Sequence, residues 1–234
     1  MNNTLEVIYQ DEYLVAVNKP YGLLVHRSPI AADASEFAIQ LLRDQLGMKV
    51  FPVHRLDRKT SGVLLFALNE DMNRIMQEGF MNKKVKKKYL ALVRGFTPAS
   101  GVIDYALTNE KGKVQDAITH FTTLKTYELP IPFGKQESSR YSLVEVNPET
   151  GRMHQIRKHL AHIFHPIIGD RPHGCNKQNK LFLERWNMNT MLLHASEISF
   201  EHPITSQIVT INANRSDEFN RILGLFDQYH VTNV

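Results

Sequence analysis

Residues 54–68 read HRLDRKTSGVLLFAL, a densely charged segment that runs directly into an uninterrupted apolar run. The run has the length of a strand, and its lack of polar residues predicts a strand buried on both faces. Asp57 lies just before this strand, among the cations Arg55, Arg58 and Lys59. Nearby cations favour the ionised carboxylate, which could act as a nucleophile, a base or a metal ligand. The alternative is a structural aspartate that only anchors its loop by accepting hydrogen bonds from backbone amides.

The apolar periodicity on both sides of this segment predicts an α+β fold. The predicted strands cover 5–9, 14–18, 62–68, 85–93, 118–127, 141–147, 192–200 and 207–211, and the predicted helices cover 34–46, 70–82, 153–164 and 216–226. Because strands and helices do not strictly alternate, we expect a mixed, mostly antiparallel central sheet flanked by helices. Asp33 and Glu36 have the spacing of a capping box at the first helix.

The chain is expected to form one catalytic domain, residues 1–234. Leu129–Ser139 is rich in Pro, Gly and polar residues, and strand patterns flank it closely, so we interpret it as a loop inside that domain. A division into two domains at this loop is the alternative. No heptad pattern suggests an oligomer, which leaves a monomer as the expectation.

Composition excludes several classes of protein. The 234 residues are 42% apolar, which is enough for a sizeable core. The single cysteine, Cys175, excludes an intramolecular disulfide and a cysteine-rich zinc site. The first residues have no secretory pattern, and no apolar run approaches the roughly 20 residues of a membrane span. These features predict a cytoplasmic protein.

Positive charge gathers in two blocks, although the net charge is only +4. Residues 81–94 hold six cations and no acid, and residues 151–180 hold six cations against Asp170 alone. This pattern favours a polyanionic partner, most simply nucleic acid. A solvated surface with uneven charge is the alternative.

The motif HRLDRKTSG resembles the signature of the RluA-type pseudouridine synthases, and further pieces resemble that family in the same order. These pieces are Asn18-Lys19-Pro20, Lys88-Tyr89, Val93-Arg94-Gly95, Thr150–Leu160, Pro166–Asp170 and Leu192–Ala195. Val25–Ser28 and His173-Gly174 resemble a subgroup that acts on transfer RNA. We also expect the chain to begin at the catalytic domain, without the S4 RNA-binding domain of many relatives.

The resemblance implies an isomerase that breaks the C1′–N1 bond of uridine, turns the base and joins C5 to C1′ without a cofactor or a metal. Asp57 matches the catalytic aspartate, Arg157 the arginine that pairs with it, and Tyr89 the tyrosine that stacks on the target base. On a helical wheel Arg157 falls at the edge of the apolar arc, where a half-buried arginine could hold a carboxylate. The structural alternatives are that Arg157 is an ordinary surface residue and that Tyr89 is an ordinary core residue of its strand.

Four further residues are expected to bind the RNA. Arg55 matches the residue that fills the place of the extruded base, although a simple phosphate contact is the alternative. Leu193 could line the base pocket or be an ordinary core leucine. Lys88 and Lys158 are candidates for phosphate contacts that position the RNA without reading its sequence.

Subgroup resemblance implies transfer RNA as the substrate, at uridine 65. A 23S rRNA synthase of the same family and a non-catalytic RNA-binding protein remain alternatives. A metal hydrolase built on His154, His159, His162 and His165 is disfavoured, because these side chains diverge on the helical wheel and no HExxH motif is present.

Overall fold

The computed structural model describes residues 4–27 and 36–231. Its internal contacts divide the chain into two compact units. Unit 1 comprises Met1–Lys87 and Ala195–Asn214, and unit 2 comprises Lys88–His194 and Arg215–Val234. No boundary falls in the loop Leu129–Ser139, and the single domain stays a prediction.

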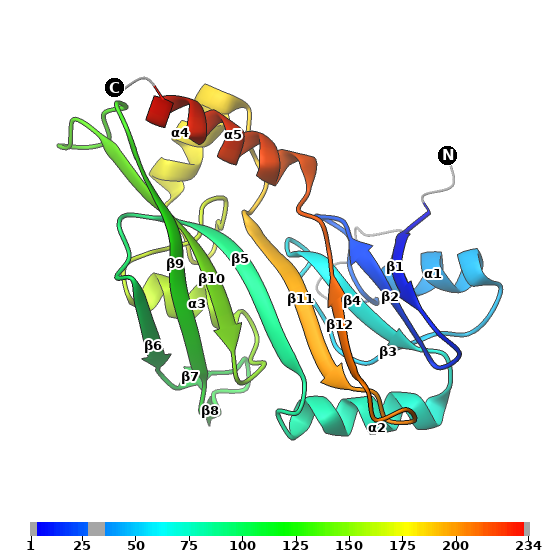
Figure 1. The fold of residues 1–234 in the computed structure, drawn as a ribbon. Helices are drawn as coiled ribbons and strands as arrows, with labels where there is room; N and C mark the ends of the chain where they lie inside the picture. Colours follow the sequence, from blue (N-terminus) through cyan, green and yellow to red (C-terminus); the bar gives the residue numbers. More distant parts are fainter. Residues whose placement is uncertain (1–3, 28–35, 232–234) are drawn as a thin grey trace. The chain divides into compact units, whose positions relative to one another are not determined.

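Unit 1 is built around a central strand that is buried along its whole length. Its elements are β1 (Glu6–Gln10), β2 (Leu14–Lys19), α1 (Ala38–Leu46), β3 (Phe51–Pro52), β4 (Ser61–Ala67), α2 (Glu70–Met81), β12 (Ile208–Asn212) and most of β11 (Leu193–Glu201) (Figure 1). The strand order is β1-β2-β4-β11, with β3 paired to β4 and β12 to β11. β4 is buried at every position, which confirms the strand predicted after Asp57.

The core of unit 1 lies between this sheet and α2. Met72 and Met76 of α2 are buried against strand residues that include Leu14 and Leu65. Asn69 caps α2, because its side chain accepts a hydrogen bond from the Met72 N–H. β4 is therefore covered by neighbouring strands at its edges and by the helix on its face, which makes it a rigid support for the loop before it.

Unit 2 contains a second run of antiparallel strands. Its elements are most of β5 (Lys86–Arg94), β6 (Ser100–Asp104), β7 (Leu107–Thr108), β8 (Val114–Gln115), β9 (Ile118–Leu129), β10 (Ser139–Pro148), α3 (Gln155–His162), α4 (Asn176–Trp186) and α5 (Asp217–Val231). The strand order is β5-β10-β9-β6, and β7 and β8 form a separate pair. Leu129 faces Ser139 across the β9–β10 ladder, so the segment between them is a hairpin connection.

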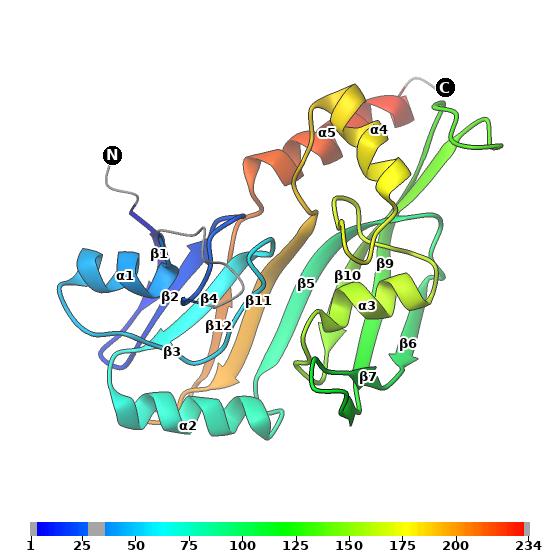
Figure 2. The same ribbon diagram turned by 180° about the vertical axis from the view of Figure 1, so that it is seen from behind.

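Helices cover the strands of unit 2. Figure 2 shows α3 lying in front of β9 and β10. The predicted apolar face of α5 is confirmed, since Phe219 and Phe226 are buried in a cluster with Tyr127 and Tyr141 of the strands. The α+β fold with a mixed, mostly antiparallel sheet is likewise confirmed. None of the helices among the described residues is long and apolar enough to cross a membrane.

Sequence patterns missed one helix and several short strands. α4 was not predicted because its first two turns are polar; its buried positions are Gln178 and Phe182, and Gln178 donates to the buried Tyr141 hydroxyl. β3, β7 and β8 have two residues each, too few to show an alternation, and β6 has only one buried residue, Ile103. The first helix starts at Ala38 with Phe37 as N-cap and no side-chain cap, whereas Asp33 of the predicted capping box lies outside the described residues.

Candidate active site

Asp57 lies in the loop between β3 and β4, and the backbone on its C-terminal side is tightly constrained. The Thr60 N–H donates to the Asp57 carbonyl oxygen at 3.0 Å, which closes a turn. Gly62 follows with φ of 108°, and a Cβ there would lie 2.1 Å from the Ala195 carbonyl oxygen. Only glycine lets β4 pass β11 this closely. The Thr-Ser-Gly sequence therefore holds Asp57 at a fixed place above the sheet.

A buried lysine supports the same loop from the end of β2. The side chain of Lys19 is fully buried. Its Nζ donates to the carbonyl oxygens of Pro20 at 3.0 Å, Leu23 at 2.8 Å and Arg58 at 3.3 Å. Burial lowers the pKa of Lys19 to about 7, although the negative charge of Asp57 acts in the opposite direction. Lys19 thus joins the segment after β2 to the loop of Asp57 and supplies positive charge near the carboxylate.

Lys19 makes stability depend on pH in a defined direction. Its pKa is about 7 in the folded protein against 10.5 ordinarily, so between these values the unfolded chain holds a proton that the folded protein has lost. Stability should therefore rise with pH in this window, by at most about 1.4 kcal/mol per pH unit, and be flat below it. Urea unfolding at pH 6, 7.5 and 9 should show this rise in the wild type but not in Lys19→Met. Parallel pH profiles for the two proteins would contradict the assignment.

His54 anchors the start of the loop as a neutral imidazole. Its Nε2 accepts a hydrogen bond from the Leu65 N–H at 3.1 Å, and its ring stacks on Phe80 with centroids 4.8 Å apart. Burial, helped by the positive charge of Lys87, lowers the pKa of His54 to about 3. The neighbouring side chain of Arg55 is exposed, so it is free of the core and able to reach a ligand.

Arg157 forms a bidentate ion pair with Asp170. Its Nε donates to Oδ2 and its NH2 group to Oδ1, both at 2.8 Å. The side chains are only 5% and 1% exposed, so Arg157 is fully buried rather than half-buried, and the alternative of a surface arginine is wrong. A guanidinium has five N–H donors, and this pair does not use all of them. The pairing of Arg157 with Asp57 stays a prediction.

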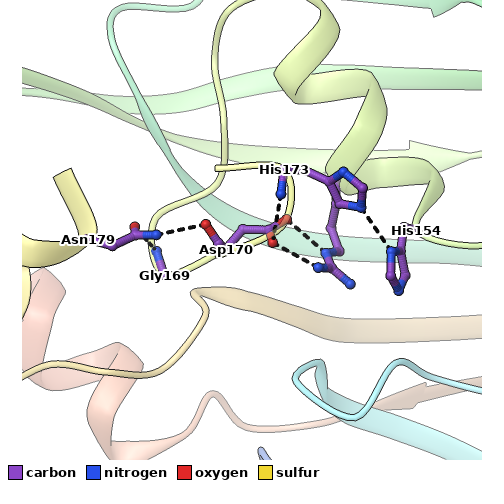
Figure 3. A network of polar contacts seen from close by, with 6 residues as sticks. His154, Gly169, Asp170, His173 and Asn179 are labelled. Atoms are coloured by element: carbon purple, nitrogen blue, oxygen red, sulfur yellow. Dashed lines mark hydrogen bonds and ion pairs between the residues drawn. The ribbon is translucent and has the colours of Figure 1, made fainter. Parts of the chain in front are cut away.

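The loop that carries Asp170 is held as tightly as the loop of Asp57. Gly169 has φ of 83°, and a Cβ there would lie 1.8 Å from the Thr190 carbonyl oxygen. Asn179 of α4 accepts from the Gly169 N–H at 2.9 Å and donates to the Asp170 carbonyl oxygen at 2.7 Å (Figure 3). The unpredicted helix α4 therefore helps to fix the carboxylate that binds Arg157.

Buried polar side chains fix α3, the helix of Arg157, to β9. The His159 Nε2 donates to the Tyr105 carbonyl oxygen at 2.9 Å, since a carbonyl can only accept. Its Nδ1 therefore accepts from the Thr119 hydroxyl at 2.9 Å, and that hydroxyl also accepts from the Gln155 amide at 2.9 Å. Burial lowers the pKa of His159, which favours this neutral form. His159 is thus a structural residue.

The other predicted site residues belong to unit 2. Tyr89 is half-buried on β5, opposite Val146 of β10, and Lys88 precedes it with a half-buried side chain. Leu193, the first residue of β11, is 3% exposed. The Nζ of Lys158 lies 3.5 Å from the Thr108 carbonyl oxygen.

Among residues 4–27 and 36–231, no group of three or more His, Cys, Asp or Glu side chains is arranged to hold a metal ion.

Comparison with known families identifies the family of this chain. Residues 13–162 match the family described as RNA pseudouridylate synthase. The matched segment contains the loop of Asp57, the strand of Tyr89 and the helix of Arg157. The chain belongs to the RNA pseudouridylate synthase family. This synthase is therefore an isomerase.

Curated relatives and solved structures agree with this assignment. The synthase is 45% identical over 234 residues to tRNA pseudouridine synthase C of Vibrio parahaemolyticus, with 95% of each chain covered. It is 44% identical over 233 residues to tRNA pseudouridine synthase C of Haemophilus influenzae, covering 95% of this chain and 98% of that one. Human RNA Pseudouridylate Synthase Domain Containing 4 matches with a TM-score of 0.72 and 26% identity, over 95% of this chain and 93% of the other.

Sequence reasoning missed two residues of the synthase that the structure places beside predicted ones. Lys19 stands in the quoted Asn18-Lys19-Pro20 motif, but no local pattern shows that its ammonium turns inward to three carbonyls. Asp170 is the only acid among the six cations of residues 151–180. That isolation was an available signal for the partner of a buried arginine.

Proposed function

We propose that this enzyme isomerises uridine 65 of transfer RNA to pseudouridine, acting in the cytoplasm as a monomer, with Asp57 as the catalytic carboxylate. The observation that carries the proposal is the match to tRNA pseudouridine synthase C over 95% of both chains. The rigid setting of Asp57 supports it, because catalytic groups must be held in place by their surroundings. The buried side chain of Lys19 also supports this loop, because its Nζ donates to the carbonyl oxygen of Arg58.

The reaction requires no oxidant, energy donor or cofactor. The C1′–N1 bond breaks, the uracil turns, and a new bond forms between C5 and C1′. The proton on C5 leaves and N1 ends with a proton, so atoms and charge balance. A carboxylate at Asp57 can assist by attacking C1′, by promoting a glycal through removal of a ribose proton, or by adding to the ring.

The other residues have supporting roles in this proposal. Arg157 is the arginine that the family resemblance pairs with the catalytic aspartate, and its ion pair with Asp170 holds it in place. Tyr89 stacks on the target base and takes part in removing the C5 proton. Arg55, which is exposed, occupies the place of the extruded base, and Leu193 lines the base pocket.

Lys88 and Lys158 are proposed to contact phosphates, which makes RNA binding sensitive to salt. The logarithm of the binding constant should fall linearly with the logarithm of salt concentration, with a slope of about −0.7 to −0.9 per phosphate contact. Lys88→Gln and Lys158→Gln should each reduce the magnitude of this slope by about one. Filter binding of transfer RNA between about 50 and about 300 mM KCl, a range that brackets physiological ionic strength, measures it. An unchanged slope in either variant would remove that lysine from the interface.

The substrate is tested by mapping pseudouridine in RNA from cells with and without the gene, using carbodiimide labelling and primer extension. Loss of the modification at uridine 65, restored by the wild type but not by Asp57→Ala, is the expected result. Loss confined to 23S rRNA would keep the reaction and overturn the substrate. No lost site in either RNA would favour a protein that only binds RNA.

A further inference from the structure

Two bonds join the same two segments of unit 2. The first is the buried ion pair between Arg157 of α3 and Asp170 of the following loop. The second is a hydrogen bond of 2.9 Å between the Nδ1 of His154 and the Nε2 of His173. Figure 3 shows the bond between His154 and His173 near the side chain of Asp170.

His154 adopts a backbone conformation that is uncommon for its residue type. It is the N-cap of α3, with φ of 56° and ψ of 26°, and its side chain makes no capping hydrogen bond. A left-handed conformation at a residue other than glycine costs roughly 1–2 kcal/mol. The helix predicted for 153–164 therefore begins two residues later, and His154 precedes it. The strained backbone instead directs its imidazole to His173.

The loop fixes His173 relative to the Asp170 carboxylate. A Cβ on Gly174 would lie 1.9 Å from the Asp170 carbonyl oxygen, so the chain folds back closely after His173. The His173 N–H also points to the Asp170 Oδ1 at 3.4 Å. A pull on the His173 ring is therefore transmitted to the carboxylate that holds Arg157.

The two rings are hydrogen-bonded rather than stacked, since their planes lie at 71° with centroids 5.1 Å apart. One ring donates its N–H and the other accepts with its lone pair. The bond is thus directional and fixes the distance between the helix start and the loop. The ion pair and the two bonds to Asn179 hold residues 169 and 170, whereas the bond between His154 and His173 holds the residues that follow them.

We propose that His154 and His173 are a positioning pair for the isomerisation: their hydrogen bond holds the loop of Asp170 against the start of α3 and so fixes the direction of the Arg157 guanidinium. The inference rests on the proposed role of Arg157. Displacing a catalytic contact by about 1 Å can cost on the order of 100-fold in rate. Loss of the pair should therefore lower kcat rather than weaken RNA binding.

Amide side chains provide matched variants, because Gln places its amide nitrogen near the position of Nε2 and Asn near that of Nδ1. His173→Gln and His154→Asn can keep the bond, and Asn also tolerates the left-handed backbone. His173→Asn is polar but too short to reach His154, and His173→Leu removes the bond altogether. His120→Gln is the control, because His120 pairs with Glu149 on the surface of the same unit.

Single-turnover and steady-state assays on transfer RNA should separate these variants. We expect His173→Leu and His173→Asn to lower kcat by about 10- to 100-fold with KM within about threefold of wild type. His173→Gln, His154→Asn and His120→Gln should stay within about threefold in kcat. Wild-type kcat in His173→Asn, or an effect confined to KM, would overturn the proposal. If His173→Leu does not fold, the comparison of Asn with Gln at the same position decides.

A measurement without substrate separates this inference from the proposed function. The Arg157 Nε–H resonance should be sharp and slow to exchange with solvent in the wild type, and should broaden in His173→Asn but not in His173→Gln. Inactivity of the wild type on transfer RNA together with this pattern would overturn the proposed function and keep the positioning pair. An unchanged Arg157 resonance in His173→Asn would overturn the positioning pair alone.

Discussion

Asp57→Ala is expected to abolish pseudouridine formation, with kcat reduced by at least about 1,000-fold, while transfer RNA still binds within about threefold of wild type. The physical reason is that the substitution removes the carboxylate but leaves the backbone turn to Thr60 in place. The basic side chains proposed to bind phosphates are also unchanged. Tritium release from C5-labelled uridine in transfer RNA measures turnover, and filter binding measures affinity.

A matched control for this variant lies in the same unit. Asp71 on α2 has a side chain that is 90% exposed, so Asp71→Ala should leave turnover unchanged. Turnover that survives in Asp57→Ala would remove Asp57 from the catalytic role. Loss of both turnover and binding would instead show that the aspartate serves to fold the loop.

Removing one partner of the Arg157–Asp170 pair should cause the largest loss of stability in unit 2. Asp170→Asn leaves a buried guanidinium without its counter-charge, which costs about 3–5 kcal/mol in comparable buried pairs. Arg157→Met leaves the carboxylate unpaired, with a similar expected cost. Urea unfolding followed by circular dichroism measures both changes. The double variant Arg157→Met/Asp170→Leu should regain part of the stability, because no unpaired charge remains.

The same pair also predicts a difference between arginine and lysine. Arg157→Lys keeps the charge but cannot make the planar, two-bond contact with Asp170. It should therefore lose most activity while keeping more stability than Arg157→Met. Full activity in Arg157→Lys would show that a bidentate geometry is not needed.

The stability prediction for the pair has its own contradicting outcome. If Asp170→Asn lowers the free energy of unfolding by less than about 1 kcal/mol, the pair contributes no more than an ordinary surface ion pair.

Local patterns in the chain were sufficient for the elements that bury a regular apolar face. The strand predicted at 62–68 was found as β4 because Val63–Ala67 are apolar without interruption and all buried. α5 was predicted because Phe219, Ile222 and Phe226 repeat with the helical period. In the same way, the charged HRLDRKTSG motif indicated the family that residues 13–162 match.

Only the tertiary structure decided which charged groups are buried and what they contact. The ammonium of Lys19 binds the Arg58 carbonyl oxygen, 39 residues along the chain, besides two nearby carbonyls. The carboxylate of Asp170 binds Arg157, 13 residues before it, and no local pattern encodes either contact. The buried face of α4 includes Gln178, which is acceptable there because the Tyr141 hydroxyl accepts its hydrogen bond. Apolar burial follows from residue type and period, whereas burial of a polar or charged group depends on a partner that folding must first bring into place.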